Sequence, residues 1–265
     1  MDDHKSWLAG VFDRAAPTYD RIGNSYHRHF AQRLVDLAAI DAGASLLDVA
    51  CGRGAVMLAA SARGVSRLTG IDVSPTMVEL AATDLHSAGV TGVDLRVMDA
   101  EDLDFPEAGF DVVTAAFALF FLPDPARATA EFWRVLRPAG SVAVSTWGRE
   151  DERWSFEDDL LASAGSAPRR GIQQPFDSAD DVAELLRAAG FADLQVHHDE
   201  TEIHFASKQQ WWDWHWSFSA RGLLEQLDPE AVAGYRDGCF REMDALEHDG
   251  GYPLGLTALI VTGRK

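Results

Sequence analysis

The segment at residues 46–54 constrains the fold of this chain more than any other. It reads Leu-Leu-Asp-Val-Ala-Cys-Gly-Arg-Gly, and residues 55–63 continue in a helical pattern. An apolar run that ends in an acid and passes through a loop of small residues into a helix predicts a strand–turn–helix unit. In a parallel sheet such a turn holds a cofactor at the carboxyl edge, beside the amino terminus of the helix.

Strand and helix patterns alternate along the rest of the chain. Strand patterns occur at residues 45–50, 67–73, 93–98, 110–116, 141–146, 194–205 and 256–263. Helical patterns lie between most of them, and the apolar runs around Val112 and Ile71 suit strands buried on both faces. This order predicts an α/β fold with a doubly wound, Rossmann-like sheet.

Two helical segments fall outside this alternation. Residues 2–40 are helical with a break near Pro17, and residues 208–249 insert helical material before the last strand. We therefore expect four parts along the chain. They are an amino-terminal helical cover at 1–40, an α/β core at 41–205, a helical lid insertion at 206–250 and a closing strand at 251–265.

The formal net charge of -19 narrows the possible partners. Such a charge repels nucleic acid and anionic membranes, so we expect neither as a partner. The two cysteines, Cys51 and Cys239, form no metal-binding or disulfide pattern. The sequence shows no signal peptide and no apolar run of membrane-spanning length, so we expect a cytoplasmic protein, monomeric or homodimeric.

The first loop is compatible with two kinds of cofactor. A nicotinamide dinucleotide calls for a GxGxxG loop with an acid about 20 residues later, and Asp72 satisfies the second condition. However, Asp48 lies just before the loop, where a carboxylate would face a pyrophosphate unfavourably. A cofactor with a positively charged amino-acid end suits this carboxylate better.

Several segments together resemble class I S-adenosylmethionine-dependent methyltransferases. Residues 46–54 resemble the first motif of that family in its ubiquinone/menaquinone-biosynthesis-like branch and natural-product relatives, with Ala50 in place of the first glycine. The resemblance continues, in chain order, at residues 19–21, 70–77, 98–101, 110–125 and 134–140.

The resemblance implies a seven-stranded sheet, mostly parallel with an antiparallel last strand, and S-adenosyl-L-methionine as cofactor. S-adenosyl-L-homocysteine would then be the product. In the family the second-motif acid binds the ribose hydroxyls and the third-motif acid reads the adenine amino group, which here are Asp72 and Asp99. The cofactor-binding residues implied in this way are Tyr19, Asp48, Ala50, Gly52, Gly54, Asp72, Val73, Met77, Asp99, Ala100, Glu101 and Ala116.

The end of the fourth strand indicates the class of methyl acceptor. It reads Thr-Ala-Ala-Phe at residues 114–117, without the acidic ligands of metal-dependent family members or the Asn/Asp-Pro-Pro-aromatic tetrad of enzymes that act on adenine or amides. We therefore expect metal-independent transfer to a small aromatic or apolar metabolite, with O-, N- and C-methylation all open.

Aromatic side chains and histidines supply the remaining candidates. A helix at residues 208–221 would place Trp211, Trp214 and His215 on one face, where they could line a pocket for a flat substrate. The substrate-binding candidates are Phe117, Phe121, Trp147, Trp211, Trp214 and His215. The catalytic candidates are His27 and His215, since a neutral imidazole in a dry pocket can accept a proton near neutral pH; His29 is a third possible base.

Four functional hypotheses remain at this point. The first is the small-molecule methyltransferase, and the second couples methylation to cyclisation with the same cofactor. The third is a cofactor-binding protein without catalysis, because a fold does not dictate a function. The fourth is a dehydrogenase, which Asp48 disfavours.

Overall fold

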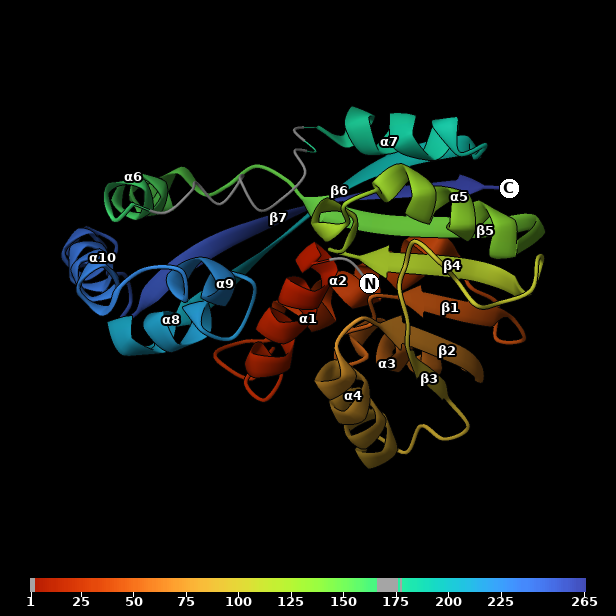
Figure 1. The fold of residues 1–265 in the computed structure, drawn as a ribbon, viewed down its shortest axis with the longest axis horizontal. Helices are drawn as coiled ribbons and strands as arrows, with labels where there is room; N and C mark the ends of the chain where they lie inside the picture. The colour runs from red at the N-terminus through yellow and green to blue at the C-terminus, as the bar shows by residue number, and fades with distance from the viewer. Residues whose placement is uncertain (1–2, 166–175, 177) are drawn as a thin grey trace.

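Seven strands form one sheet in the order β3-β2-β1-β4-β5-β7-β6. The computed structural model describes residues 3–165, 176 and 178–265. The strands are β1 (Ser45–Val49), β2 (Arg67–Asp72), β3 (Asp94–Val97), β4 (Phe110–Ala116), β5 (Leu136–Trp147), β6 (Ala192–Phe205) and β7 (Tyr252–Arg264). The pairs among β1 to β5 are parallel, and β7 runs antiparallel to both of its neighbours. The expected α/β fold class with an antiparallel last strand is confirmed (Figure 1).

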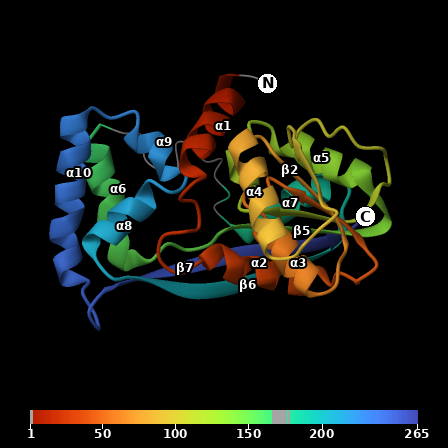
Figure 2. The same cartoon turned by 90° about the horizontal axis from the view of Figure 1, so that it is seen from below.

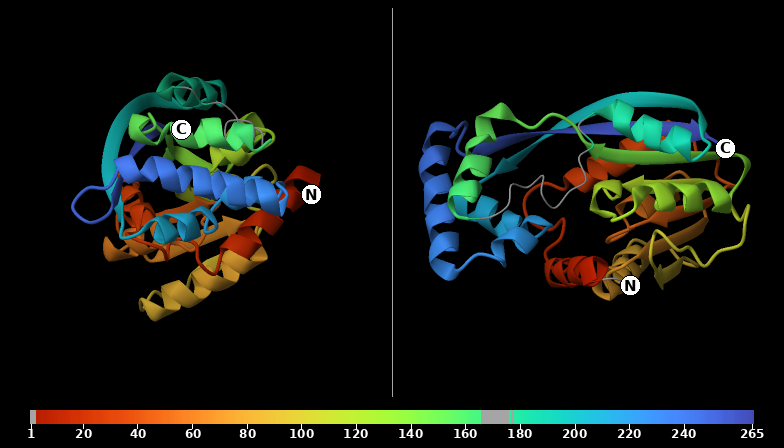
Figure 3. Two further views of the ribbon diagram at one scale, coloured as in Figure 1. Left: turned by 90° about the vertical axis from the view of Figure 1, so that its left-hand side faces the viewer. Right: turned by 45° about the horizontal axis from the view of Figure 1, so that its top comes forward.

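Helices cover both faces of this sheet. The helices are α1 (Asp3–Ala15), α2 (Tyr26–Ala38), α3 (Ala55–Ala62), α4 (Pro75–Ser87), α5 (Pro125–Val135), α6 (Phe156–Ser163), α7 (Ala179–Ala188), α8 (Lys208–His215), α9 (Ala220–Leu224) and α10 (Pro229–Glu242). Because side chains alternate along a strand, Leu46 packs with α2, α3 and α4 whereas Leu47 packs with α5 and α7. The two groups of helices lie on opposite faces (Figure 3).

Two strands begin four or five residues before the position expected from the sequence, whereas the other strand boundaries differ by at most two residues. Strand β5 begins at Leu136 rather than at residue 141, because α5 ends at Val135 and the chain at once becomes extended and pairs with Phe110. Strand β7 begins at Tyr252 rather than at residue 256, because β6 pairs with it as far as Phe205. Tertiary pairing, which no local pattern encodes, adds these residues to the strands.

The longer β6 and β7 carry a helical lid. Their paired ends extend beyond the parallel strands, and α6, α8, α9 and α10 lie over them (Figure 2). A separate core of aromatic and aliphatic side chains joins these helices to the paired ends of β6 and β7. Its buried members include Trp211, Phe205 and Cys239. We call α6, α8, α9 and α10 the lid. Helix α6 therefore joins the insertion at 206–250, although it lies within the range expected for the core; residues 166–175 and 177 of that range lie outside the described residues.

The amino-terminal helices connect the lid to the sheet. Helix α1 contacts both α4 and α9, and α2 packs on α3 and β5. Ser25 caps α2 by accepting a hydrogen bond from the backbone N–H of Arg28, which fixes the start of that helix after the break. Among the described residues, no helix has the length and apolar character needed to cross a membrane.

Candidate active site

Two adjoining cavities lie at the carboxyl edge of the parallel strands. The sheet-edge cavity, of about 90 Å³, lies between this edge and α1. The lid cavity, of about 190 Å³, lies between the sheet, α2 and the lid. Four side chains line both cavities, namely Phe12, Tyr19, Phe117 and Phe121. A group bound in one cavity therefore lies next to a group bound in the other.

Nine of the twelve predicted cofactor residues line the sheet-edge cavity. They are Tyr19, Ala50, Gly52, Asp72, Val73, Met77, Asp99, Ala100 and Ala116. Asp48, Gly54 and Glu101 do not line it. Gly54 belongs to the loop after β1, Asp48 lies behind this loop, and Glu101 lies at the rim of the cavity.

The loop after β1 turns through left-handed backbone conformations. Ala50, Gly52 and Gly54 have φ angles of 54°, 50° and 85°. The carboxylate of Asp72 accepts a hydrogen bond from the backbone N–H of Gly52 at 2.8 Å, and its other oxygen accepts one from Ser74 at 2.9 Å. Burial raises the pKa of Asp72 to about 6. The end of β2 thus holds the loop in place, and left-handed Ala50 carries a strain of about 1–2 kcal/mol.

Asp48 lies directly behind this loop. In the register of the sheet it stands between Gly70 of β2 and Thr114 of β4. Its Oδ1 accepts a hydrogen bond from the Thr114 hydroxyl at 2.8 Å, whereas its buried Oδ2 has no hydrogen-bond partner among the described residues. Burial raises the pKa of Asp48 to about 7. A buried carboxylate oxygen without a donor is costly, so the site suits a ligand that brings a cationic group to this loop.

The outer end of the sheet-edge cavity contains an ion pair that the sequence did not predict. Lys5 of α1 donates to Asp99 Oδ2 at 2.7 Å and to Glu101 Oε2 at 2.5 Å. Glu101 Oε1 also accepts from the backbone N–H of Asp124 at 2.8 Å. Glu101 therefore holds the rim of the cavity together. A lysine in an amphipathic amino-terminal helix gives no sequence signal for such a role.

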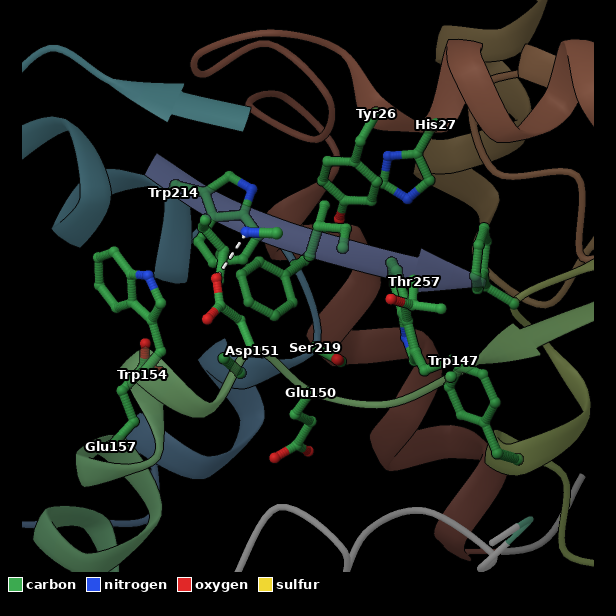
Figure 4. A pocket seen from close by; sticks show the side chains of 18 of the residues that line it. Tyr26, His27, Trp147, Glu150, Asp151, Trp154, Glu157, Trp214, Ser219 and Thr257 are labelled. Carbon is green, nitrogen blue, oxygen red and sulfur yellow. Dashed lines mark hydrogen bonds between the residues drawn. The ribbon is translucent and has the colours of Figure 1, made fainter. Parts of the chain in front are cut away.

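Aromatic rings form a large part of the wall of the lid cavity, as Figure 4 shows for Tyr26, Trp147, Trp154 and Trp214. Trp147 stacks on Phe117 with the ring centroids 4.1 Å apart. The predicted substrate residues Phe117, Phe121, Trp147 and Trp214 all line this cavity. Tyr26, Trp154 and Phe218 line it too and were not predicted, although each lies in an aromatic-rich segment of the sequence.

His27 lines the lid cavity and has both ring nitrogens engaged. Nδ1 is 3.2 Å from Asp20 Oδ1, and Nε2 is 2.8 Å from the Tyr19 hydroxyl. The carboxylate of Asp20 favours the tautomer whose Nδ1–H donates to it, so Nε2 is the basic nitrogen. Hydrogen bonds from His27 and Ser25 hold the pKa of Asp20 below its usual value despite its burial, which raises it. Asp20, which we did not predict as a site residue, thus orients His27.

Trp211 and His215 do not reach either cavity, which corrects the expectation that they contact the substrate. Their exposed fractions are 0% and 1%. The Nε2 of His215 lies 3.0 Å from Glu157 Oε2, and its Nδ1 lies 3.2 Å from the backbone carbonyl of Trp211. Glu157, not His215, lines the lid cavity. The packing of α8 against α6 places this face of the helix in the core of the lid, which rules out His215 as a base in this arrangement.

His29, the third possible base, also lies away from the cavities. It pairs with Asp199 of β6 at 2.9 Å on the outer side of α2. The three candidate histidines therefore differ in whether they line a cavity. Only His27 lines a cavity.

Comparisons with known proteins agree with this geometry. Residues 47–144 match the family model described as "Methyltransferase domain". Nocamycin O-methyltransferase from Saccharothrix syringae is 33% identical over 96% of this chain and 97% of its own length. Demethylmenaquinone methyltransferase from Lactiplantibacillus plantarum is 33% identical over 76% of this chain and 96% of its own length. The crystal structure of the [4+2]-cyclase SpnF has a TM-score of 0.57 at 26% identity, and the match covers 90% of this chain and 80% of that one.

The full-length similarity to an enzyme at 33% identity shows the family. The methyl donor of that family is S-adenosyl-L-methionine, whose α-ammonium group is a cation of the kind that the buried oxygen of Asp48 favours. The chain therefore belongs to the class I S-adenosylmethionine-dependent methyltransferases that act on small molecules.

Proposed function

We propose that this enzyme methylates an oxygen atom of a small, hydroxylated aromatic or conjugated metabolite. The observation that supports the proposal most strongly is the position of His27 in the lid cavity, with its Nε2 2.8 Å from the hydroxyl of Tyr19, which lines both cavities. Oxygen acceptors such as phenols and enols lose a proton as they are methylated, so a base at the point of transfer favours them. The name of the relative from Saccharothrix syringae, an O-methyltransferase, supports the same choice.

The sheet-edge cavity would hold the methyl donor. Asp72 would accept hydrogen bonds from the ribose hydroxyls, and Asp99 would face the adenine amino group. Asp48 would compensate the positive charge of the cofactor's α-ammonium group. The donor would supply an activated methyl group, which an aligned acceptor oxygen would attack in line, with S-adenosylhomocysteine as the leaving group. Alignment of this kind accounts for roughly 7–11 kcal/mol of the barrier in favourable cases, and the four side chains shared by the cavities would provide it.

His27 would take the proton of the acceptor. The Tyr19 hydroxyl forms a hydrogen bond with the basic Nε2 of His27 in the structure. Burial holds the pKa of this hydroxyl above its usual value. Tyr19 would therefore stay neutral and pass protons rather than ionise. The acceptor hydroxyl gives its proton to Tyr19 Oη as Tyr19 gives its own to His27, while the acceptor oxygen gains the methyl group. Asp20 stabilises the resulting imidazolium.

The lid cavity would select the acceptor by shape. Tyr26, Trp147 and Trp214 present flat faces, and aromatic pairs are worth about 0.5–1.5 kcal/mol beyond the burial of their area. Glu150, Asp151 and Glu157 line the same cavity (Figure 4). Their charge disfavours an anionic acceptor, so we propose that the acceptor group is a neutral hydroxyl rather than a carboxylate.

A methyl-transfer assay tests this proposal. The wild-type enzyme is incubated with donor labelled in the methyl group and a panel of hydroxylated anthraquinones, enols, indoles, amines and aromatic carboxylic acids, and products are identified by mass spectrometry. We expect methyl ethers of the phenols or enols. Exclusive methylation of nitrogen, carbon or carboxylate would refute the proposal.

Cyclisation is the second candidate, favoured by the structural likeness to a [4+2]-cyclase. The same assay separates the two, because a cyclised product without methylation has the mass of its precursor and carries no label.

A further inference from the structure

Lys5 is a buried lysine on the wall of the sheet-edge cavity. It is 8% exposed, and it lines the cavity together with Leu8 and Phe12 of the same helix. Lysine is rarely buried unless it is paired, and Lys5 pairs with two carboxylates, Asp99 and Glu101. These hydrogen bonds outweigh the burial of Lys5, so that its pKa is raised. Its charge is therefore present at neutral pH.

The contacts of Lys5 fix both acids in one arrangement. Asp99 Oδ1 accepts from the backbone N–H of Glu101 at 3.0 Å while Asp99 Oδ2 accepts from Lys5. Glu101 in turn accepts from Asp124, just before α5. Lys5 thus connects α1 with the chain after β3 and, through Glu101, with the chain before α5. Charge-assisted hydrogen bonds of this kind are about twice as strong as neutral ones.

The other end of α1 is anchored as well. Asp13 Oδ1 accepts hydrogen bonds from the hydroxyl of Ser74 at 2.6 Å and from the backbone N–H of Thr76 at 3.1 Å. Arg14 forms an ion pair with Glu225 beyond α9. Helix α1 is therefore attached at both ends across the sheet-edge cavity. A ligand in this cavity is enclosed as long as both attachments hold.

We propose that Lys5 is a positioning residue of the cofactor site, which fixes Asp99 beside the adenine and keeps α1 closed over the bound cofactor. The inference rests on the proposed placement of the cofactor in the sheet-edge cavity. Lys5 acts through Asp99 and through α1 and takes no part in the methyl transfer itself. Its removal therefore accelerates the release of the cofactor product and weakens its binding.

Tighter binding of the cofactor after removal of Lys5 is the outcome that would contradict this proposal. The ammonium of Lys5 and the adenine amino group are both donors to Asp99. If they competed for the same oxygen, removal of Lys5 would strengthen binding. Asp99 has a second oxygen, which accepts only a backbone N–H at 3.0 Å, so a carboxylate with two acceptor atoms can serve both donors.

The experiment compares Lys5→Met, Lys5→Arg and the control Lys208→Met. Lys208 of α8 pairs with Asp244, just after α10, so its replacement removes the same charge away from the cavity. Binding of S-adenosylhomocysteine is measured by calorimetry, and its release by stopped-flow displacement with tryptophan fluorescence. We expect Lys5→Met to weaken binding on the order of tenfold, mainly through faster release. Lys5→Arg and Lys208→Met should bind within about twofold of wild type.

Steady-state kinetics add a readout that loss of structure alone would not give. Lys5→Met should raise the KM for S-adenosylmethionine and leave kcat equal or higher. If Lys5→Met lowers the melting temperature of the ligand-free protein, Glu101→Gln serves as a second variant. It weakens the same ion pair while Asp99 remains, and should show a smaller change in the same direction.

Unchanged or tighter binding in Lys5→Met, or a loss of binding in Lys5→Arg equal to that in Lys5→Met, would overturn the inference. Asp72→Ala separates this failure from a failure of the cofactor site. If Asp72→Ala abolishes binding while Lys5→Met does not change it, only the role of Lys5 is refuted. If Asp72→Ala binds as wild type does, the placement of the cofactor is wrong.

Discussion

The Tyr19 hydroxyl lies 2.8 Å from Nε2 of His27, at the point where the two cavities meet. The sequence suggested Tyr19 as a cofactor residue and His27 as a base, without any link between them. Because Asp20 engages the other ring nitrogen, the three side chains form one hydrogen-bonded chain in the order Tyr19, His27, Asp20.

His27 should be needed for transfer to oxygen and not for cofactor binding. We expect His27→Asn to lower kcat about 100-fold or more, the usual range for loss of a general base, with binding of S-adenosylhomocysteine unchanged. His29→Asn on the same helix is the matched control, since His29 pairs with Asp199 away from the cavities. Full activity of His27→Asn at neutral pH would contradict the role of His27 as the base.

Asp20 should act on catalysis through His27. In Asp20→Asn the side chain no longer favours the tautomer with a basic Nε2, so we expect a smaller loss of kcat, on the order of tenfold. Tyr19→Phe should reduce kcat as well, because the path to His27 is interrupted. The measurement is the pH dependence of kcat for each variant. A pH profile identical to that of wild type in Asp20→Asn would argue against a link between Asp20 and the base.

Asp48 should make the ligand-free protein less stable as the pH rises. Its folded pKa of about 7 lies above the ordinary value of 3.8, and so does that of Asp72 at about 6. Burial favours the protonated forms, so this stabilisation is complete below about pH 4 and is lost as the pH rises through the folded values. We expect Asp48→Asn to reduce the decline in the free energy of unfolding between pH 5 and pH 8 by about 1–3 kcal/mol, as measured by chemical denaturation at each pH.

Cofactor affinity should depend on Asp72 and not on acids of the neighbouring strand. Asp72→Asn loses one of the two acceptors that hold Gly52 and Ser74, so we expect binding of S-adenosylhomocysteine to weaken about 10- to 100-fold. Asp94→Asn on β3 is the control, because Asp94 pairs with exposed Arg96. Calorimetry measures both, and equal affinities for the two variants would count against the assignment of Asp72.

Trp147 and Trp211 should affect different properties of the enzyme. Trp147 lines the lid cavity and stacks on Phe117, so Trp147→Leu should raise the KM for the acceptor with little change in melting temperature. Trp211 is fully buried behind the cavity wall, and Trp211→Ala should cost about 3–5 kcal/mol of stability. Chemical denaturation and steady-state kinetics together check this contrast; it fails if Trp211→Ala is as stable as wild type.

Removal of divalent metal should leave the activity unchanged. The carboxyl end of β4 presents Ala116 and Phe117 to the cavities rather than carboxylates. We expect the same rate of methyl transfer before and after dialysis against EDTA, with added Mg²⁺ as the comparison. A loss of activity that Mg²⁺ restores would require a metal-dependent mechanism instead.

The sequence by itself determined the sheet and the loop that faces the cofactor. Motif residues such as Asp48, Gly52 and Asp72 follow strands directly, and parallel strands bring their carboxyl ends to one edge. A local pattern is therefore sufficient to place them together. The order of the elements followed in the same way, whereas the antiparallel last strand was an expectation from the resemblance to the family.

Only the tertiary structure decided which residues of the helical parts face the site. The periodicity of α8 gives Trp211, Trp214 and His215 a common face. However, α8 packs against both α6 and β6, and of the three residues only Trp214 lies at the cavity. Asp20 and Lys5 gained their roles in the same way, from contacts across 7 and 94 residues. Local sequence fixes which side of a helix is apolar, whereas the surface that this side meets depends on the path of the whole chain.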